Sequence, residues 1–265
     1  MQNMYLRKET IVSRDKFSLE GKNAVITGGT TGLGLSIAEC MIEAGARAVV
    51  VSMDPQEVFD ENLGKYGDKA AYYQFNITDT DHTQALADQI IAEHGNIDIL
   101  VNNAGNHCKK PIEEMTVADY ESVLNVHLVG AFAMTKAFVP HMRKQKSTSI
   151  IFQASMTSFI GQPYVMGYSI AKAGYLGMVH TLASEVSKDG VRVNAIAPGW
   201  IDTPMFRKAT DNDPERKAKI LGRTPMNKVG EPNDIGMAAV FLSSDAAKFI
   251  TGICLPVDGG ALIGF

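Results

Sequence analysis

The sequence predicts an α/β protein built on one parallel sheet of about seven strands, with helices packed on both faces. Two observations predict it: short β-branched runs alternate with longer amphipathic segments, and most of the short runs are apolar throughout. Strands that helices bury on both faces read as continuous apolar runs, and repeated strand–helix alternation gives parallel strands joined by right-handed crossovers. The expected strands are Asn23–Thr27, Ala48–Ser52, Tyr72–Asn76, Ile97–Val101, Ser149–Gln153, Val191–Ile196 and Ile253–Val257. The expected helices include segments 33–44, 80–94, 118–142, 167–188 and 233–244.

The alternation begins near residue 18 and continues to the C-terminus without a linker-like Gly/Ser/Pro stretch or an internal repeat. We therefore expect a single domain over residues 18–265, preceded by an N-terminal tail over residues 1–17 that shows no periodicity. Residues 202–229 interrupt the pattern with charged residues and three prolines. Because so long a connection inside a compact domain is usually functional, we expect a substrate lid there, with an ordinary surface excursion as the alternative.

The composition argues against several classes of protein. Net charge is −4 at pH 7 and no basic block stands out, so we expect no nucleic-acid partner and no anionic membrane surface. No uninterrupted apolar run reaches the roughly 18 residues of a membrane helix, and the N-terminus lacks the apolar core of a secretion signal. Three widely spaced cysteines suit a reducing compartment, so we expect a cytoplasmic protein. The six histidines show no metal-ligand spacing, and we expect no catalytic metal.

A glycine-rich segment follows the first expected strand and precedes a helical pattern. It reads Thr27-Gly28-Gly29-Thr30-Thr31-Gly32-Leu33-Gly34. Glycines let the backbone turn tightly and approach a pyrophosphate, and the free N–H groups at the start of a helix attract phosphate. The segment predicts a Rossmann-type dinucleotide site, although glycine-rich turns alone are common and the spacing differs from Gly-x-Gly-x-x-Gly.

The end of the second strand bears on the choice between NAD and NADP. Asp54 lies 20 residues after Gly34, where a carboxylate can bind the ribose hydroxyls of NAD. No Lys or Arg stands between Ser52 and Asp54 to bind the 2′-phosphate of NADP. We therefore expect NAD as the cofactor, with NADP as the alternative. If Asp54 only opens a turn before Pro55, it would not favour either cofactor.

Tyr168 and Lys172 lie four residues apart in a helical segment and therefore share one face. A tyrosine with an ordinary pKa of about 10 is a poor acid–base catalyst at neutral pH. Lowering that pKa by three units needs about 4 kcal/mol, which an ammonium roughly 4 Å away would supply at an effective dielectric near 20. Ser155, just after an apolar strand, would hydrogen-bond the substrate oxygen. We expect Tyr168 to exchange the proton of an alcohol while a nicotinamide exchanges hydride; an ordinary surface Tyr–Lys pair is the alternative.

These features occur together with further motifs, in order along the chain. The motifs are Thr27-Gly28-x-x-x-Gly32-x-Gly34, Asn102-Asn103-Ala104-Gly105, Ser155, Tyr168-x-x-x-Lys172, Arg192-Val193-Asn194, Pro198-Gly199 and Val257-Asp258-Gly259-Gly260. In this combination the chain resembles the short-chain dehydrogenase/reductase family from about residue 18 to the C-terminus. The resemblance implies an NAD(P)-dependent oxidoreductase that interconverts secondary alcohols and ketones.

The resemblance also implies roles for individual residues. Asn103 would contact the adenine ribose, Lys172 the nicotinamide ribose, and Ile201 with Thr203 the carboxamide side. The cofactor-binding set is then Gly28, Thr30, Thr31, Gly32, Leu33, Gly34, Asp54, Asn76, Ile77, Asn103, Ala104, Gly105, Tyr168, Lys172, Pro198, Gly199, Ile201 and Thr203.

Two positions depart from the pattern of the family. Asn76-Ile77 stands where many members place an Asp for the adenine, and this change is mild. His127 stands in a helix where the family usually has an Asn that helps to hold a water leading to Lys172. Either His127 or its backbone carbonyl holds this water, or proton delivery differs; a purely structural histidine is the alternative.

Within the family, the chain is most similar to the group of gluconate 5-dehydrogenases and 2-deoxy-gluconate 3-dehydrogenases. That group often has basic residues where this chain has His107, Lys109 and Lys110, so the two lysines would hold a sugar-acid carboxylate, unless they are simply solvated. We expect a sugar acid, sugar or polyol as substrate. The alternatives are a ketoreductase of acyl or cyclic alcohol substrates and a non-catalytic cofactor-binding regulator, although the complete Ser155, Tyr168 and Lys172 set disfavours the latter.

The two longest expected helices, 118–142 and 167–188, carry more apolar positions than one sheet face needs. By resemblance to the family, these helices would form a four-helix contact in a dimer. A tetramer that also uses the C-terminal segment is expected.

Overall fold

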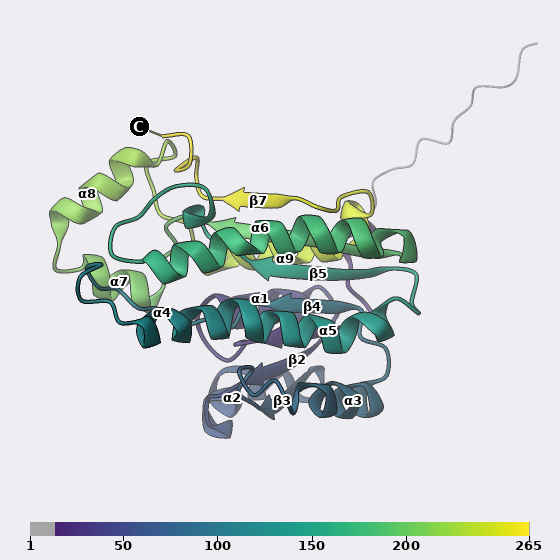
Figure 1. Cartoon of the computed structure of the whole chain (residues 1–265). Coiled ribbons are helices and arrows are strands. Elements are labelled where there is room, and N and C mark those ends of the chain that lie inside the picture. Colours follow the sequence, from purple (N-terminus) through teal and green to yellow (C-terminus); the bar gives the residue numbers. More distant parts are fainter. Residues whose placement is uncertain (1–13, 265) are drawn as a thin grey trace, which may run out of the picture.

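A sheet of seven strands runs through the molecule, and every adjacent pair of strands is parallel (Figure 1). The order across the sheet is β3-β2-β1-β4-β5-β6-β7. The strands are β1 (Asn23–Thr27), β2 (Arg47–Ser52), β3 (Ala70–Gln74), β4 (Ile99–Asn102), β5 (Thr148–Gln153), β6 (Val191–Pro198) and β7 (Cys254–Val257). This computed structural model, which describes residues 14–264, confirms the expected doubly wound α/β fold.

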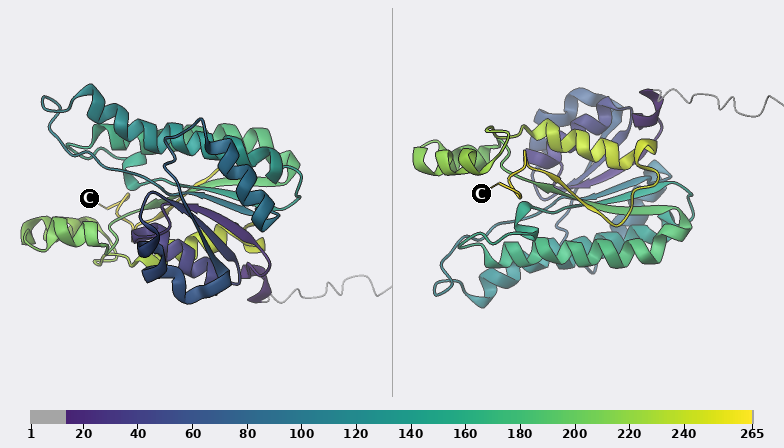
Figure 2. Two further views of the ribbon diagram at one scale, coloured as in Figure 1. Left: turned by 90° about the horizontal axis from the view of Figure 1, so that it is seen from below. Right: turned by 90° about the horizontal axis from the view of Figure 1, so that it is seen from above.

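Helices cover both faces of the sheet (Figure 2). They are α1 (Gly32–Glu43), α2 (Gln56–Leu63), α3 (Thr83–His94), α4 (Val117–Leu124), α5 (Ala131–Met142), α6 (Met166–Val186), α7 (Pro204–Thr210), α8 (Pro214–Arg223) and α9 (Pro232–Ser243). One buried cluster joins α3, α5 and α6 to one face, and a second joins α1, α2 and α9 to the other. In β1, Val25 belongs to the first cluster while Ala24 and Ile26 belong to the second, because successive residues of a strand point to opposite faces. Burial on both sides explains the continuous apolar runs.

The edge of the sheet departs from the sequence-based boundaries. β3 starts and ends two residues earlier than the expected strand Tyr72–Asn76. It pairs only with β2, in a register that aligns Ala48 with Ala70. Backbone pairing with its single neighbour, rather than apolar content, therefore sets the limits of β3.

α4 and α5 are joined by a π-helical turn, Asn125–Gly130, into one continuous helix over Val117–Met142. An 18-residue window of this helix has a mean hydropathy of 1.4, so the helix is long and apolar enough to cross a membrane by length and composition alone. The expectation from the sequence, which considered only uninterrupted apolar runs, did not include it. Half of its apolar window is buried in the structure, where α5 packs on the sheet face that it shares with α3 and α6. Core helices of globular proteins are apolar in the same way.

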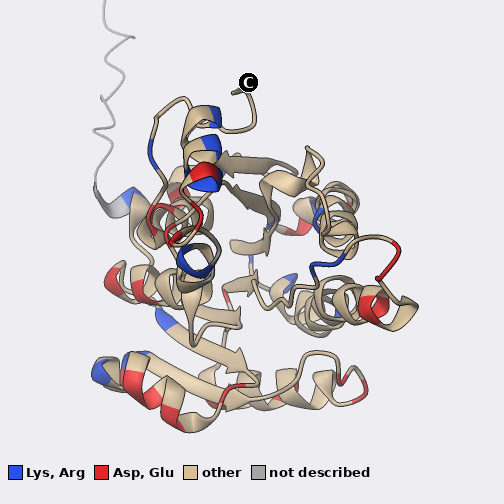
Figure 3. Cartoon of the chain, turned by 90° about the vertical axis from the view of Figure 1, so that its left-hand side faces the viewer, with Lys and Arg blue, Asp and Glu red and all other residues tan. Residues whose placement is uncertain are grey.

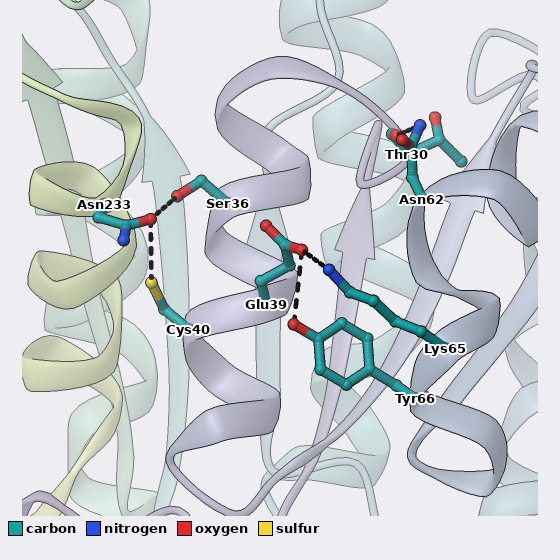
Figure 4. A network of polar contacts seen from close by, with 8 residues as sticks. All are labelled: Thr30, Ser36, Glu39, Cys40, Asn62, Lys65, Tyr66 and Asn233. Carbon is teal, nitrogen blue, oxygen red and sulfur yellow. Dashed lines mark hydrogen bonds and ion pairs between the residues drawn. The ribbon is translucent and has the colours of Figure 1, made fainter.

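The start of α1 is held from two sides (Figure 4). Ser36 Oγ donates to Asn233 Oδ1 at the start of α9, at 3.0 Å. Asn62 Nδ2 on α2 donates to the backbone oxygen of Thr30 at 3.1 Å. These contacts fix the glycine-rich segment relative to the sheet, and that segment is part of the candidate site.

Residues 1–13 of the expected tail lie outside the described residues. Arg14–Phe17 form a short 3-10 helix. The Phe17 ring lies 6.2 Å from the ring of Phe241 on α9, between ring centroids.

Candidate active site

The predicted site residues gather around the carboxyl edge of the sheet, on the left in Figure 1 and toward the viewer in Figure 3. Thr27 ends β1, Asn102 ends β4, Gln153 ends β5 and Pro198 ends β6. The direction of winding reverses between β1 and β4, and open parallel sheets bind ligands at such a point.

The glycine-rich segment has the geometry of a phosphate-binding turn. Gly28 and Gly32 have φ of +64° and +56°, a region that side chains with a Cβ rarely adopt. A Cβ on Gly34 would clash with the carbonyl oxygen of Gly28, so the turn can close only with glycine there. Thr31, at the N-cap of α1, makes no side-chain cap bond, and the first turn of α1 contains no acidic residue. Its N–H groups are therefore available to an anion, which fits the pyrophosphate of a dinucleotide.

Asn103 braces this turn from β4. Its Nδ2 donates to the backbone oxygens of Thr27 and Gly28, both at 3.0 Å. Thr27 Oγ1 accepts from the backbone N–H groups of Asn103 and Ala104, again at 3.0 Å. The structure thus gives Asn103 a role in holding the glycine turn, and its contact with an adenine ribose stays a prediction.

Asp54 lies beside the same turn. Its Oδ2 accepts hydrogen bonds from Ser52 Oγ at 3.0 Å and from Thr30 Oγ1. Tyr72 Oη donates to the backbone oxygen of Asp54. Two hydroxyl groups and the neighbouring strand therefore orient this carboxylate at the end of β2.

The other predicted cofactor residues also lie near this edge. Ile77 is buried against Gly130, while Asn76 is exposed and its Oδ1 accepts from the backbone and hydroxyl of Thr78. Gly199 approaches Asp258 too closely for a Cβ. Thr203 Oγ1 caps α7 by accepting from the backbone N–H of Phe206 at 3.2 Å.

Ser155, Tyr168 and Lys172 meet where β5 faces α6. Lys172 is almost fully buried, and its Nζ donates to the backbone oxygen of Gln153. The same Nζ lies 5.4 Å from the centroid of the Tyr168 ring. Ser155 is also buried, with its Oγ accepting from the backbone N–H of Thr157 at 3.2 Å.

The pKa values of Tyr168 and Lys172 are both shifted by burial. Burial raises the pKa of Tyr168 above its ordinary value, and a hydrogen bond with Ser155 offsets part of this rise. Burial also lowers the pKa of Lys172 to about 7. In the protein without a bound cofactor, the expectation that Lys172 lowers the pKa of Tyr168 is therefore wrong. Desolvation acts on both groups, and it disfavours both the phenolate of Tyr168 and the ammonium of Lys172.

His127 lies in the π-helical turn and is 2% exposed. Its Nε2 is 2.9 Å from the backbone oxygen of Asn106. A carbonyl oxygen only accepts, so Nε2 carries the proton and Nδ1 is an acceptor. Nδ1 is buried and has no partner among the described residues. Burial, assisted by the positive charge of Lys172, lowers the pKa of His127 to about 3, so the ring is neutral.

Two imidazoles flank Tyr168, which the sequence did not reveal. The His127 ring lies edge-on at 5.5 Å between centroids, on the buried side. The His107 ring lies at 4.9 Å, and His107 is exposed. Tyr175, one helical turn after Lys172, is fully buried, and its Oη has no hydrogen-bond partner among residues 14–264. Lys172 Nζ lies 4.9 Å from its ring centroid. No spacing rule links His107 to Tyr168, so only the folded chain identifies this contact.

The two lysines of the candidate carboxylate site have different surroundings. Lys110 Nζ pairs with Asp119 at 2.8 Å, and its backbone N–H donates to Tyr164 at 2.9 Å. Lys109 is exposed and makes no ion pair within residues 14–264. Of the expected pair, only Lys109 is left to bind an anion.

The expected excursion at 202–229 folds into α7 and α8 with short connections. A bridge between Ile201 and Gly230 closes its base, with Asp202 N–H donating to the oxygen of Gly230 at 2.8 Å. The C-terminal segment contacts the last residues of the excursion, where Met226 N–H donates to the oxygen of Gly259 at 3.1 Å. The excursion thus stands on a closed neck, and α7 and α8 lie at the carboxyl edge of the sheet (Figure 1).

Within residues 14–264 there is no group of three or more His, Cys, Asp or Glu side chains placed to hold a metal ion. The described geometry places an acid–base group, Tyr168, and an uncapped helix start, at α1, near the same edge of the sheet.

Comparisons with known proteins agree with this geometry. A family model described as enoyl-(acyl carrier protein) reductase matches residues 28–261. The chain is 39% identical to 2-dehydro-3-deoxy-D-gluconate 5-dehydrogenase of Formosa agariphila, over 95% of this chain and 96% of the relative. It is 34% identical to the 3-oxoacyl-[acyl-carrier-protein] reductase of Thermotoga maritima, over 92% and 99%. A solved gluconate 5-dehydrogenase from Burkholderia cenocepacia, in complex with NADP and tartrate, superposes with a TM-score of 0.89 at 30% identity, covering 95% of this chain and 99% of the other.

Proposed function

Because the chain belongs to the short-chain dehydrogenase/reductase family, we propose that it interconverts the alcohol and the ketone of a sugar acid, with Tyr168 as acid–base residue. It is an NAD(P)-dependent oxidoreductase of CH–OH groups. The observation that carries the role of Tyr168 is its position on one helix face with Lys172, beside Ser155 at the carboxyl edge. The 39% identity to a sugar-acid dehydrogenase over nearly the whole chain supports the substrate class.

In the proposed reaction, Tyr168 Oη takes the proton of the alcohol during oxidation and returns it to the ketone oxygen during reduction. A bound nicotinamide supplies or accepts the hydride. Ser155 Oγ donates a hydrogen bond to the substrate oxygen. Protonated Lys172 stabilises the phenolate of Tyr168, and the phenolate favours protonated Lys172, so that the two groups titrate as a pair.

We propose that the cofactor is NAD and that the start of α1 holds its pyrophosphate. The Asp54 carboxylate, oriented by Thr30 and Ser52, suits ribose hydroxyls and repels a 2′-phosphate. NADP is the alternative, and the NADP bound to the Burkholderia cenocepacia relative favours it. The remaining cofactor contacts are proposed from their positions near the carboxyl edge: Leu33, Asn76, Ile77, Ala104, Gly105, Pro198, Gly199, Ile201 and Thr203.

His127 is proposed to take the place of the Asn that is usual in the family. Its unpartnered Nδ1 would accept a hydrogen bond from a water on the path to Lys172. His127→Ala should then slow turnover and spare NADH affinity. Unchanged turnover would remove His127 from proton delivery.

Lys109 is proposed to bind the substrate carboxylate. The variant Lys109→Met keeps the aliphatic stem and removes the charge, so it should raise KM for sugar acids but not for neutral polyols. Equal KM values for sugar acids in variant and wild type would exclude this role.

The proposal extends to the excursion, the cellular compartment and the assembly of the protein. The excursion at 202–229 would cover the substrate, since α7 and α8 lie at the carboxyl edge of the sheet (Figure 1). The protein would be cytoplasmic, as its three free cysteines suggest. It would associate with itself into dimers or tetramers.

The experiment is a rate measurement at the absorbance band of reduced nicotinamide, with NAD or NADP, against sugar acids, polyols, cyclic alcohols and a 3-oxoacyl thioester. We expect the fastest turnover with a sugar acid and NAD, and loss of turnover but not of NADH binding in Tyr168→Phe. Fastest turnover of the thioester would instead support the ketoreductase alternative, which the similarity to the Thermotoga maritima reductase favours. Binding of NADH without turnover of any substrate would support the regulator.

A further inference from the structure

The segment His107-Cys108-Lys109 is fixed at both ends, and Tyr168 lies beside it. Before the segment, the Asn106 carbonyl accepts from His127 Nε2 at 2.9 Å, and Asn106 Nδ2 donates to the backbone oxygen of Ser122 at 3.3 Å. After it, Lys110 bonds Tyr164 through its N–H and Asp119 through its Nζ. The segment therefore has little freedom to move away from Tyr168.

His107 is an exposed side chain whose ring lies against the ring of Tyr168. The buried side chains of His127, Lys172 and Ser155 also lie next to Tyr168. The His107 ring, at 4.9 Å between centroids and tilted by 42°, lies on the solvent side. A substrate whose oxygen reaches Tyr168 Oη from this exposed side would place its neighbouring atoms beside the His107 ring.

The chemistry of His107 indicates what those neighbouring atoms should be. Its pKa is lowered, first because neighbouring groups partly desolvate the exposed ring and then by the charge of Lys109, so the ring is neutral above pH 7. A neutral imidazole presents one N–H donor and one nitrogen acceptor. A hydroxyl group both donates and accepts, whereas a hydrocarbon group would leave both ring nitrogens unpaired at an additional cost.

We propose that His107 is a specificity residue that hydrogen-bonds the substrate hydroxyl next to the reacting carbon, and so selects vicinal diols and hydroxyketones over simple secondary alcohols. This inference rests on the proposed oxidoreductase site at Tyr168, and it adds a residue and a substrate feature to it.

The test compares His107→Phe and His107→Asn with the wild type. Phenylalanine keeps a ring against Tyr168 and removes both nitrogens, while asparagine keeps a donor and an acceptor without the ring. His82→Phe, at an exposed histidine bonded to Asp79, is the matched control. The substrates are the best polyhydroxylated substrate of the wild type and cyclohexanol, and NADH affinity is measured by fluorescence.

We expect His107→Phe to lower kcat/KM for the polyhydroxylated substrate about tenfold, the size of one lost hydrogen bond to a group left unpaired. The same variant should leave cyclohexanol turnover and NADH affinity unchanged, and His107→Asn should recover part of the loss. Equal effects on both substrates, or no effect on either, would overturn the role of His107 while the proposed function stands. A wild type that turns over cyclohexanol but no polyhydroxylated compound would overturn both.

Discussion

At the scale of single residues, burial decides the charges in the site. Tyr168, Lys172 and His127 are all shifted toward their neutral forms, and desolvation is the largest cause in each case. Neutral groups can still bind and orient a substrate. Proton transfer requires that a charge form, and the pH at which it forms is therefore a sensitive readout of the site.

The pH dependence of alcohol oxidation should reflect Tyr168. Oxidation needs the phenolate, and burial raises the pKa of Tyr168, so kcat/KM for oxidation should rise between pH 7 and pH 10. Because the hydrogen bond with Ser155 lowers this pKa, Ser155→Ala should move the profile to higher pH. The measurement is a pH–rate profile with saturating cofactor, and a profile that is flat from pH 7 to 10 would contradict the assignment.

The stability of the protein in acid should depend on His127. The unfolded chain protonates this side chain below about pH 6.5, while the folded chain resists protonation down to about pH 3. The unfolded state therefore binds more protons in this range, and the free energy of unfolding falls as pH is lowered, by ~1 kcal/mol per pH unit. His127→Asn removes this contribution. Urea unfolding at pH 7 and pH 5 should show a smaller loss for the variant, and equal losses would refute the buried neutral imidazole.

At the scale of elements, the junction between β1 and α1 combines a tight turn with an uncapped helix start. Gly28 and Gly32 supply the positive φ, Asn103 holds the turn from β4, and Thr31 leaves the first N–H groups of α1 without a side-chain cap. A helix start without a cap lacks stabilisation that Ser, Thr, Asp or Asn normally provide. A phosphate group would provide that stabilisation when it binds.

Gly34→Ala should abolish dinucleotide binding, because the new Cβ would clash with the Gly28 carbonyl and open the turn. The matched control is Gly177→Ala on α6, where a Cβ meets nothing within 4 Å and alanine should stabilise the helix by up to ~1 kcal/mol. NADH titration and thermal unfolding measure both effects. Wild-type NADH affinity in Gly34→Ala would show that the turn does not contact the cofactor.

At the scale of the whole molecule, several apolar side chains remain exposed on α4, α5, α6 and the π-helical turn between α4 and α5. They are Val117, Val129, Phe132, Met166 and Ile170. Phe249, next to the edge strand β7, is fully exposed. Apolar surface of this kind marks contact sites, and symmetric dimers reuse one patch on both subunits.

We therefore expect a tetramer in sedimentation experiments. Phe132→Glu should weaken the contact of α4, α5 and α6, and Phe249→Glu the contact at β7, so that each variant sediments as a smaller species. Lys188→Glu is the control for a changed surface charge, because Lys188 is exposed and lies just before the start of β6. A wild type that is monomeric at micromolar concentration would contradict the assembly.

Local patterns in the sequence predicted the elements and the chemistry that depend on neighbours along the chain. The strand Asn23–Thr27, the glycine turn and the Tyr168–Lys172 pair all rest on fixed spacings, since a strand alternates its faces and a helix brings residues four apart together. Patterns along the chain did not predict α7 and α8, because residues 202–229 resemble a charged loop. Short helices with proline at their start depend on caps and tertiary support more than on apolar periodicity.

The sequence by itself determined the sheet, the dinucleotide turn and the three residues that carry the proposed chemistry. Only the tertiary structure decided their electrostatics and their surroundings. Lys172 donates to Gln153 from 19 residues away, His127 reaches Asn106 across 21 residues, and His107 lies against Tyr168. The direction of each pKa shift follows from burial among such distant neighbours, and burial is a property of the folded chain that spacing along the sequence does not contain.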